Sequence, residues 1–246
     1  LATSSAASDV YKRQELDWVI VRENTEGEYS GAGGRVHPKL PQEVGIDVSV
    51  FTRDGIERVM RYAFELALTR PKKQLTLVTK SNAQRHGMVL WDEVFEKLKH
   101  DYPGITTDRM LVDAITTRMV LQPQSLDTIV ATNLHADILS DLAAALSGSL
   151  GIGPTANINP ERTFPSMFEP IHGSAFDLVG KDLANPLGAF WSCVTMLEHL
   201  QENKGASLLM SAIEEVCREG QHLPKDLGGN SCTGEVTTAV CAALKK

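Results

Sequence analysis

The spacing of apolar residues changes along the first half of the chain between the short runs typical of strands and the three-to-four-residue period of helices. Apolar runs bounded by polar or turn residues predict strands at 16–21, 74–80, 109–114 and 126–133. Helical periodicity covers 53–70 and 88–103, and a further helical segment ends near Pro123. Because strands and helices alternate, we expect right-handed crossovers and an α/β fold with a mainly parallel sheet.

The remaining segments predict an arm and a second domain. Residues 22–52 are polar and rich in glycine, with two prolines, which favours an extended hairpin or arm. A Gly- and Pro-rich stretch at 147–165 is expected to cross between domains, and helices are expected through Trp191 and Leu197, over 206–220 and around 235–246, with no obvious strand. We therefore expect a small α/β domain at 15–148 and a second domain at 149–246. The small, polar residues 1–14, which lack an initiator Met, are expected to be a non-native tail.

Composition narrows the class of partner. The chain has 31 acidic and 24 basic residues, a net charge of −7, which argues against binding nucleic acid or an anionic membrane through bulk electrostatics. No apolar run is long enough for a membrane span. The four cysteines lie in the last quarter without CxxC spacing, so we expect mostly buried, reduced thiols in a cytoplasmic protein, with a disulfide pair as the alternative.

Polar residues follow three successive predicted strands. Lys80, Asp113 and Asn133 stand at or just past the strand ends, and Asp137 follows on the next helix. In open parallel sheets, ligands bind beyond the carboxyl ends of the strands. The sequence therefore predicts a binding site at this edge.

Two acidic residues are spaced to lie on one helix face. Asp137 and Asp141 are four residues apart in "NLHADILSDL". Together with Asp113 they could hold Mg²⁺ or Mn²⁺, which prefer oxygen ligands. The alternative is that acids in a first helical turn oppose the helix dipole.

Three further side chains suit acid–base or carboxylate chemistry. Lys80 ends an apolar strand, where desolvation can lower the pKa of an ammonium enough for a base, or it is an ordinary surface lysine. Arg22 and Tyr29 could supply a carboxylate clamp and a phenolic acid. The alternative for this pair is a positioned loop arginine and a packed tyrosine.

A loop in the second domain could approach a nucleotide. In "HGSAFD", Gly173 permits close approach of the backbone to a ligand, and Asp177 could accept from ribose hydroxyls. The GxGxxG turn of a Rossmann fold is absent from the sequence. Asn185 could pair with an adenine edge or cap the helix that starts at Pro186.

Taken together, these motifs resemble the β-decarboxylating dehydrogenases, the family of isocitrate, isopropylmalate, D-malate and tartrate dehydrogenases. The resemblance runs from about Glu15 to the C-terminus and is densest in "VRENTEGEYSG", "TKSN", "VDA", "NLHADILSDLAAAL", "FEPIHGSAFD" and "GKDLANP". Three other stretches are most similar to the D-malate/tartrate branch: "SVFTRDGIERVMRYAFELA", "NPERTFPSMFEP" and "FWSCVTMLEHL". The resemblance implies an isopropylmalate-dehydrogenase-like two-domain fold.

The resemblance also implies a role for each site residue. Arg22 would bind the substrate carboxylate, Lys80 would assist removal of the hydroxyl proton, and Tyr29 would protonate the enol left after CO2 departs. Mg²⁺ or Mn²⁺ would be held by Asp113, Asp137 and Asp141, with Lys80 and Asp113 reaching into a neighbouring subunit's site. This sharing implies a homodimer with an arm near residues 30–50 at its interface. The NAD-binding residues would be Asn82, His172, Gly173, Ser174, Ala175, Asp177 and Asn185, where acidic Asp177 favours NAD over NADP.

The chain departs from the family in three ways. It has "HAD" at 135–137 where many relatives have "FGD", and "SAFD" where they have "SAPD", both of which we interpret as branch differences. Family members are longer, and we expect N-terminal strands and two substrate-clamping arginines to be missing, so the fold would be incomplete. The expected reaction is oxidation and decarboxylation of D-malate or tartrate by the whole protein, with the fragment inactive. Isocitrate or 3-isopropylmalate as substrate, or a catalytically silent subunit, are the alternatives.

Overall fold

The computed structural model describes residues 16–245, which form two compact units, one ending at Ala143 and the other beginning at Ala144. The expected tail at 1–14 lies outside the described residues. The long helix α5 (Asn133–Ser147) runs through the division. None of the helices in the described part of the chain is long and apolar enough to cross a membrane.

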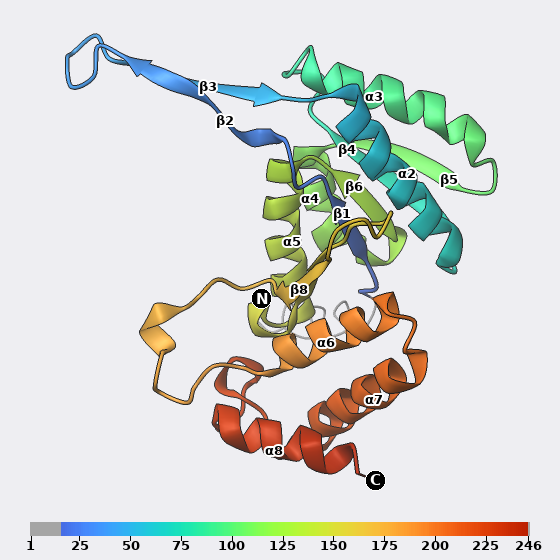
Figure 1. Cartoon of the computed structure of the whole chain (residues 1–246), viewed down its shortest axis with the longest axis vertical. Coiled ribbons are helices and arrows are strands. Elements are labelled where there is room, and N and C mark those ends of the chain that lie inside the picture. The colour runs from blue at the N-terminus through green and yellow to red at the C-terminus, as the bar shows by residue number, and fades with distance from the viewer. Residues whose placement is uncertain (1–15, 246) are drawn as a thin grey trace, which may run out of the picture. The chain divides into compact units, whose positions relative to one another are not determined.

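The first unit is built on a four-stranded parallel sheet in the order β1-β6-β4-β5 (Figure 1). The strands are β1 (Val19–Arg22), β4 (Gln74–Thr79), β5 (Thr106–Leu111) and β6 (Thr128–Ala131). The central strands β4 and β6 are almost wholly buried, as strands covered on both faces must be. The expected α/β fold with a mainly parallel sheet is therefore confirmed.

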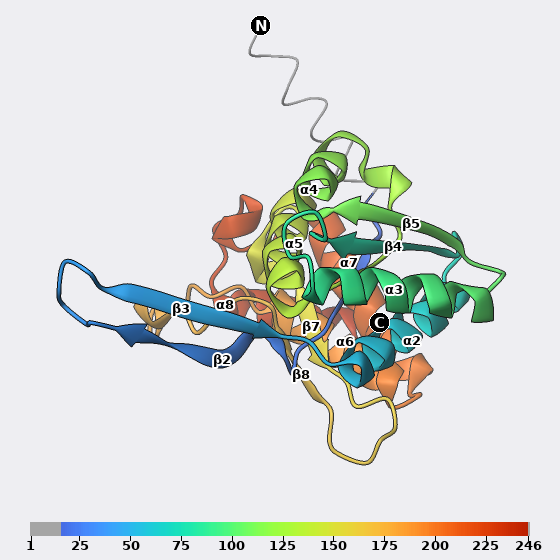
Figure 2. The same cartoon turned by 90° about the horizontal axis from the view of Figure 1, so that it is seen from above.

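Helices cover both faces of this sheet. Figures 1 and 2 show α2 (Arg53–Thr69) and α3 (Gly87–Leu98) on one face, with α4 (Val112–Leu121) and α5 on the other. Thr52 caps α2 by accepting from the Gly55 N–H at 3.0 Å. The apolar stripe of α2 packs with α3, β4 and β6 in a core that includes Ile56, Met60, Phe64, Leu75, Leu77, Trp91, Phe95 and Val130. Both predicted helices are confirmed.

The polar segment after β1 forms the predicted arm. Strands β2 (Gly27–Val36) and β3 (Val44–Val50) pair antiparallel, with an irregular register between Gly27 and Ala32, and they project from the unit as a two-stranded ribbon (Figure 2). Most residues of the ribbon are exposed. The hairpin interpretation of this segment is confirmed.

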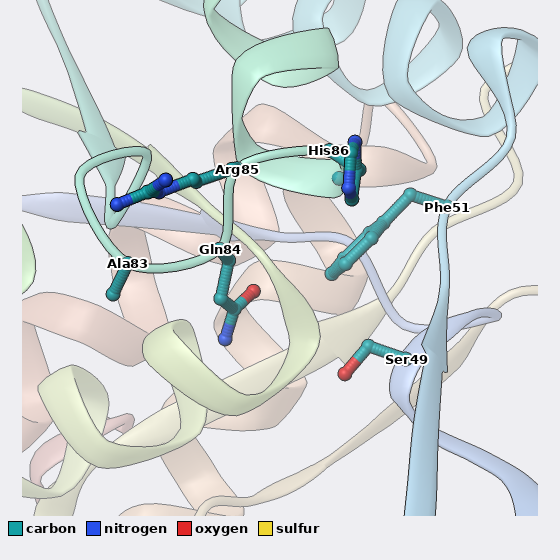
Figure 3. A pocket seen from close by; sticks show the side chains of 7 residues that line it. Ser49, Phe51, Ala83, Gln84, Arg85 and His86 are labelled. Atoms are coloured by element: carbon teal, nitrogen blue, oxygen red, sulfur yellow. The ribbon is translucent and has the colours of Figure 1, made fainter.

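Phe51 anchors the base of the arm. Its ring packs edge-on against Trp91, with ring centroids 6.4 Å apart, and lines an open pocket of about 460 Å³ together with Ser49 and residues 83–87 (Figure 3). A Cβ at Gly87 would lie 2.3 Å from Phe51 Cδ2, and one at Gly27, where φ is +86°, would lie 3.3 Å from the same ring. The ring therefore occupies space that only glycine leaves open.

Replacing Gly87 by alanine is accordingly expected to destabilise the first unit by about 1–3 kcal/mol, because the methyl group must displace a packed ring. Urea unfolding followed by circular dichroism measures the change. Gly104→Ala is the control, since its Cβ would meet only Leu68 Cδ2 at 3.9 Å. Equal free energies of unfolding for the two variants would contradict this expectation, because they would show that the Phe51 ring can move aside without destabilising the unit.

The second unit consists of three helices and a small two-stranded sheet. Helices α6 (Leu187–His199), α7 (Asn203–Glu219) and α8 (Thr233–Ala243) share a core built around Leu187, Val194, Ile213, Val216, Val236 and Val240. α7 ends at Gly220, where the sequence predicted the end of a helix, and Gly220 adopts the left-handed conformation. The described residues also contain short 3-10 turns: in the first unit at Lys99–Asp101 and Pro123–Ser125, and in the second at Leu150–Ile152, Phe176–Leu178 and Lys225–Leu227.

The expectation that this part of the chain contains no strand is wrong. Strands β7 (Pro154–Asn157) and β8 (Met167–Pro170) pair antiparallel and pack on α6. β7 begins and β8 ends with proline, and neither four-residue sequence, PTAN or MFEP, is the continuous apolar run that marked the strands of the parallel sheet.

Candidate active site

An arginine, an asparagine and an aspartate meet at the carboxyl edge of the parallel sheet. Arg22 is the last residue of β1, and Asn133, the first residue of α5, is separated from the neighbouring strand β6 only by Thr132. Arg22 Nε and Nη2 donate to Asn133 Oδ1 at 2.9 and 2.7 Å, and Arg22 Nη1 donates to Asp137 Oδ1 at 2.5 Å. The sheet thus brings together side chains that are more than 100 positions apart.

Tyr29 joins this group from the arm. Its hydroxyl donates to Asp137 Oδ2 at 3.2 Å, and the Arg22 guanidinium carbon lies 5.7 Å from the centre of the ring. Partial desolvation and the Asp137 carboxylate raise the pKa of Tyr29 above its ordinary value, against the lowering effect of Arg22. The phenol is therefore protonated at neutral pH and, at 56% exposed, is accessible to a ligand.

The position of the acids on α5 excludes one alternative. The helix begins at Asn133 and has no acid in its first turn, so Asp137 and Asp141 lie in the second and third turns. The helix dipole acts on charges within the first turn. Stabilisation by the helix dipole is therefore a poor explanation for the presence of Asp137 and Asp141, which share one face of the helix.

Lys80 and Asp113 form a second group. Lys80 follows β4 and its ammonium donates to Asp113, an exposed carboxylate whose pKa this hydrogen bond lowers. The sequence placed Asp113 in a strand, which is wrong: β5 ends at Leu111 and Asp113 lies in the first turn of α4. Asn82 is exposed in the turn closed by the Ala83 and Gln84 N–H groups, both donating to Lys80 O at 2.9 Å.

Asp113, Asp137 and Asp141 do not converge within one chain. Over residues 16–245 no three carboxylate, imidazole or thiol side chains are arranged to hold a metal ion. Asp137 carries an ion pair with Arg22, and Asp113 carries one with Lys80. The metal assignment of the three aspartates stays a prediction.

The predicted nucleotide loop is exposed on the second unit. His172, Gly173, Ser174, Ala175 and Asp177 are all exposed, and Ala175 adopts a left-handed φ of 41° just before a 3-10 turn. The His172 ring lies against its neighbour's carbonyl, with Nδ1 2.9 Å from Gly173 O. The loop therefore presents backbone and the Asp177 carboxylate to solvent.

Asn185 uses its side chain at the start of α6. Its Oδ1 accepts from the Leu187 N–H at 2.9 Å, and its Nδ2 donates to Asp226 at 2.9 Å. The hydrogen bond from Leu187, the first residue of α6, agrees with a role for Asn185 at the start of this helix, although the residue in the N-cap position is Pro186.

Sequence reasoning missed Glu28 and the hydrogen-bonding role of Asn133. Asn133 was singled out only for its place at a strand end, yet its oxygen accepts two hydrogen bonds from Arg22. Glu28, next to Tyr29, binds the start of α5 and was not singled out at all. The signal for Asn133 is a polar residue close after a buried strand, whereas nothing in the local sequence pattern marks Glu28.

The structure is that of an α/β protein whose arginine, asparagine, tyrosine and aspartate gather at the carboxyl edge of a parallel sheet, the edge at which open α/β sheets bind ligands. Over residues 2–242 the sequence matches the isocitrate/isopropylmalate dehydrogenase family, so the chain belongs to that family. The resemblance on which the sequence analysis relied is confirmed.

Individual relatives are similar over almost the whole chain. A probable tartrate dehydrogenase/decarboxylase of Agrobacterium vitis is 65% identical over 230 residues, which are 94% of this chain and 64% of the relative. The decarboxylating D-malate dehydrogenase of Escherichia coli is 48% identical, covering 94% of this chain and 65% of its own length. The structure of isocitrate dehydrogenase from Methylococcus capsulatus matches with a TM-score of 0.88 at 38% identity, over 94% of this chain and 68% of that one. The chain thus spans less than two thirds of these tartrate and D-malate relatives, whose names agree with the expected branch.

Proposed function

We propose that this chain belongs to an NAD-dependent, divalent-metal-assisted enzyme that oxidises and decarboxylates D-malate or tartrate. The observation that carries the proposal is the pair of contacts on Asp137, one from Arg22 and one from Tyr29, at the carboxyl edge of the parallel sheet. The named relatives act on these two acids, which supports the choice of substrate.

Arg22 and Lys80 suit the first half of this reaction. The Arg22 guanidinium is a planar donor that can bind a substrate carboxylate, with Asn133 holding it in place. Lys80 would assist removal of the hydroxyl proton, and NAD⁺, when bound, would accept the hydride from the carbinol carbon, so that the alcohol would become a ketone. The substrate thereby loses one hydride and one proton.

Tyr29 suits the second half. The bond to the carboxylate that departs as CO2 breaks, and its electron pair stays on the remaining carbon skeleton as an enolate. The Tyr29 hydroxyl, held by Asp137 and kept protonated by its raised pKa, would then give its proton to that carbon. D-malate would yield pyruvate and CO2.

The donor set of α5 fits a hard divalent cation. Asp137 and Asp141 offer two carboxylates on one helix face, and oxygen ligands of this kind suit Mg²⁺ or Mn²⁺. Asp113 would complete the set from the partner subunit, because one chain does not gather all three. Such an ion would polarise the substrate oxygen and stabilise negative charge on it.

The exposed loop on the second unit fits a dinucleotide. Its backbone is open to a ligand around Gly173, and Asp177 offers a carboxylate for ribose hydroxyls. An acid at this point repels a 2′-phosphate, so NAD would be preferred to NADP. Asn82 and Asn185 complete the proposed NAD contacts. We further propose that the protein is cytoplasmic and forms a homodimer, in which each active site is shared between the two subunits.

Turnover assays test the proposal. We expect a chimera, in which the part of the Agrobacterium vitis relative not matched by this chain is joined to residues 15–246, to produce NADH from D-malate or tartrate with Mn²⁺. The 246-residue chain alone is expected to give no turnover. NADH production by the chain alone would contradict the second expectation, and a folded chimera without activity on either acid would contradict the first.

The alternative substrates are tested in the same assay. Isocitrate and 3-isopropylmalate are offered to the chimera under matched conditions, because the structural neighbour from Methylococcus capsulatus is an isocitrate dehydrogenase. Preference for either acid would overturn the proposed substrate class. A silent subunit would be expected to lack one of Tyr29, Lys80 or the aspartates, all of which are present.

A further inference from the structure

Glu28 binds the first residues of α5 with both oxygens of its carboxylate. The Thr132 hydroxyl donates to Oε1 at 3.0 Å, and the Leu134 N–H donates to Oε2 at 3.2 Å. Thr132 is fully buried and also accepts from the His135 N–H at 3.4 Å. Glu28 thus supports the capping residue of α5 and takes one N–H that the helix itself leaves unpaired.

The arm is tied to α5 at two further points beside Glu28. Asn133 Nδ2 donates to the Glu26 carbonyl at 3.2 Å, and Tyr29 donates to Asp137. Consecutive residues of a regular strand point to opposite faces, yet Glu28 and Tyr29 both reach the same helix. The positive φ of Gly27 and the irregular register after it account for this arrangement.

The other two glutamates of "RENTEGEY" have different partners. Glu23 is buried and accepts from the Thr25 and Glu26 N–H groups within its own turn. Glu26 accepts from the Thr52 N–H at 2.8 Å, at the start of α2. Of the three carboxylates, only that of Glu28 is hydrogen-bonded to the helix that carries Asp137 and Asp141.

We propose that Glu28 is a positioning residue, which fixes the arm to the start of α5 and so places the Tyr29 hydroxyl against Asp137. Both carboxylate oxygens of Glu28 accept hydrogen bonds, one from the Thr132 hydroxyl just before α5 and one from the Leu134 N–H within it, which argues against Glu28 acting as an acid, a base or a metal ligand. The charge also lies at a helix N-terminus, where a carboxylate is stabilised. The catalytic part of this inference rests on the proposed function, and the structural part does not.

Hydrogen exchange in the 246-residue chain tests the structural part. In Glu28→Gln the neutral amide is a weaker acceptor, so the Leu134 N–H is expected to exchange about tenfold faster by NMR. Glu28→Asp keeps the charge but is shorter by one methylene, and it is expected to show the same increase because it cannot reach both donors. Glu57→Gln removes a carboxylate paired with Arg61 on α2 and should leave Leu134 unchanged. Unchanged exchange in both Glu28 variants would overturn the proposal.

A double-mutant cycle in the chimera tests the catalytic part. Glu28→Gln is expected to lower kcat about tenfold with little change in KM when Tyr29 is present, and to have almost no effect in a Tyr29→Phe background. Equal losses in the two backgrounds would show that Glu28 does not act through Tyr29 and would overturn the proposal. A chimera with no turnover would count against the proposed function alone, since the exchange experiment decides the structural part without it.

Discussion

Replacing Asp137 and Asp141 together by asparagine is expected to lower kcat/KM of the chimera by about a thousandfold or more, and to abolish Mn²⁺ binding while the fold stays intact. A bound cation contributes several kcal/mol of charge stabilisation, and asparagine keeps the size of each side chain while removing its charge. Electron paramagnetic resonance of free Mn²⁺ measures binding, and circular dichroism monitors the fold.

Two further variants distinguish the loss of a specific metal site from a general effect of removing acidic charge. Glu96→Gln removes a surface carboxylate in the last turn of α3, where it pairs with Lys99, and this variant should bind Mn²⁺ as the unaltered chimera does. Asp141→Asn alone leaves the Arg22–Asp137 pair in place, so any loss of Mn²⁺ affinity in it cannot come from a released arginine. Unaltered Mn²⁺ affinity in the double variant would remove both residues from the metal site.

The parallel sheet could be predicted because its signals are local. Apolar runs such as "QLTLVT" and the helical period of 53–70 report burial directly, and the structure places β4 and α2 there. The end of β5 was misplaced because the apolar run in "RMLVDA" continues from the end of β5 into the start of α4, and periodicity does not locate a boundary inside one apolar run. The strands β7 (PTAN) and β8 (MFEP) were missed because neither is a continuous apolar run with β-branched residues, as the equally short β1 (VIVR) and β6 (TIVA) are.

The site was predictable only in part, for a different reason. Lys80, Asn133 and Asp137 could be placed at one edge from strand order alone, and Arg22 and Tyr29 were candidates by residue type. Their hydrogen bonds depend on the register between β1 and β6 and on the irregular start of β2, which no local pattern specifies. The same long-range pairing hides Glu28, whose partners are more than 100 positions away.

A buried carboxylate at the opposite edge of the sheet was equally hidden from the sequence. Asp127 precedes β6, is 1% exposed and accepts from Arg70 Nε at 2.5 Å. Arg70 also donates to the Asp17 carbonyl at 2.7 Å. Burial acts to lower the pKa of Arg70, but hydrogen bonds to Asp17 and Asp127 raise it above its ordinary value. This pair joins the ends of α2, β1 and β6 far from the residues proposed for catalysis.

Arg70→Met is therefore expected to destabilise the first unit by about 3–5 kcal/mol, because it leaves the Asp127 carboxylate buried without its cation. Urea unfolding at neutral pH measures the loss. Arg61→Met, within α2, is the matched control: its pair with Glu57 is partly exposed to solvent, so the change should cost less than about 1 kcal/mol. A second variant, Arg70→Met with Asp127→Leu, removes both charges and should recover much of the stability, since the cost lies in the unpaired ion rather than in the absent pair. Similar losses in the single and double variants would instead assign the effect to packing of the arginine stem.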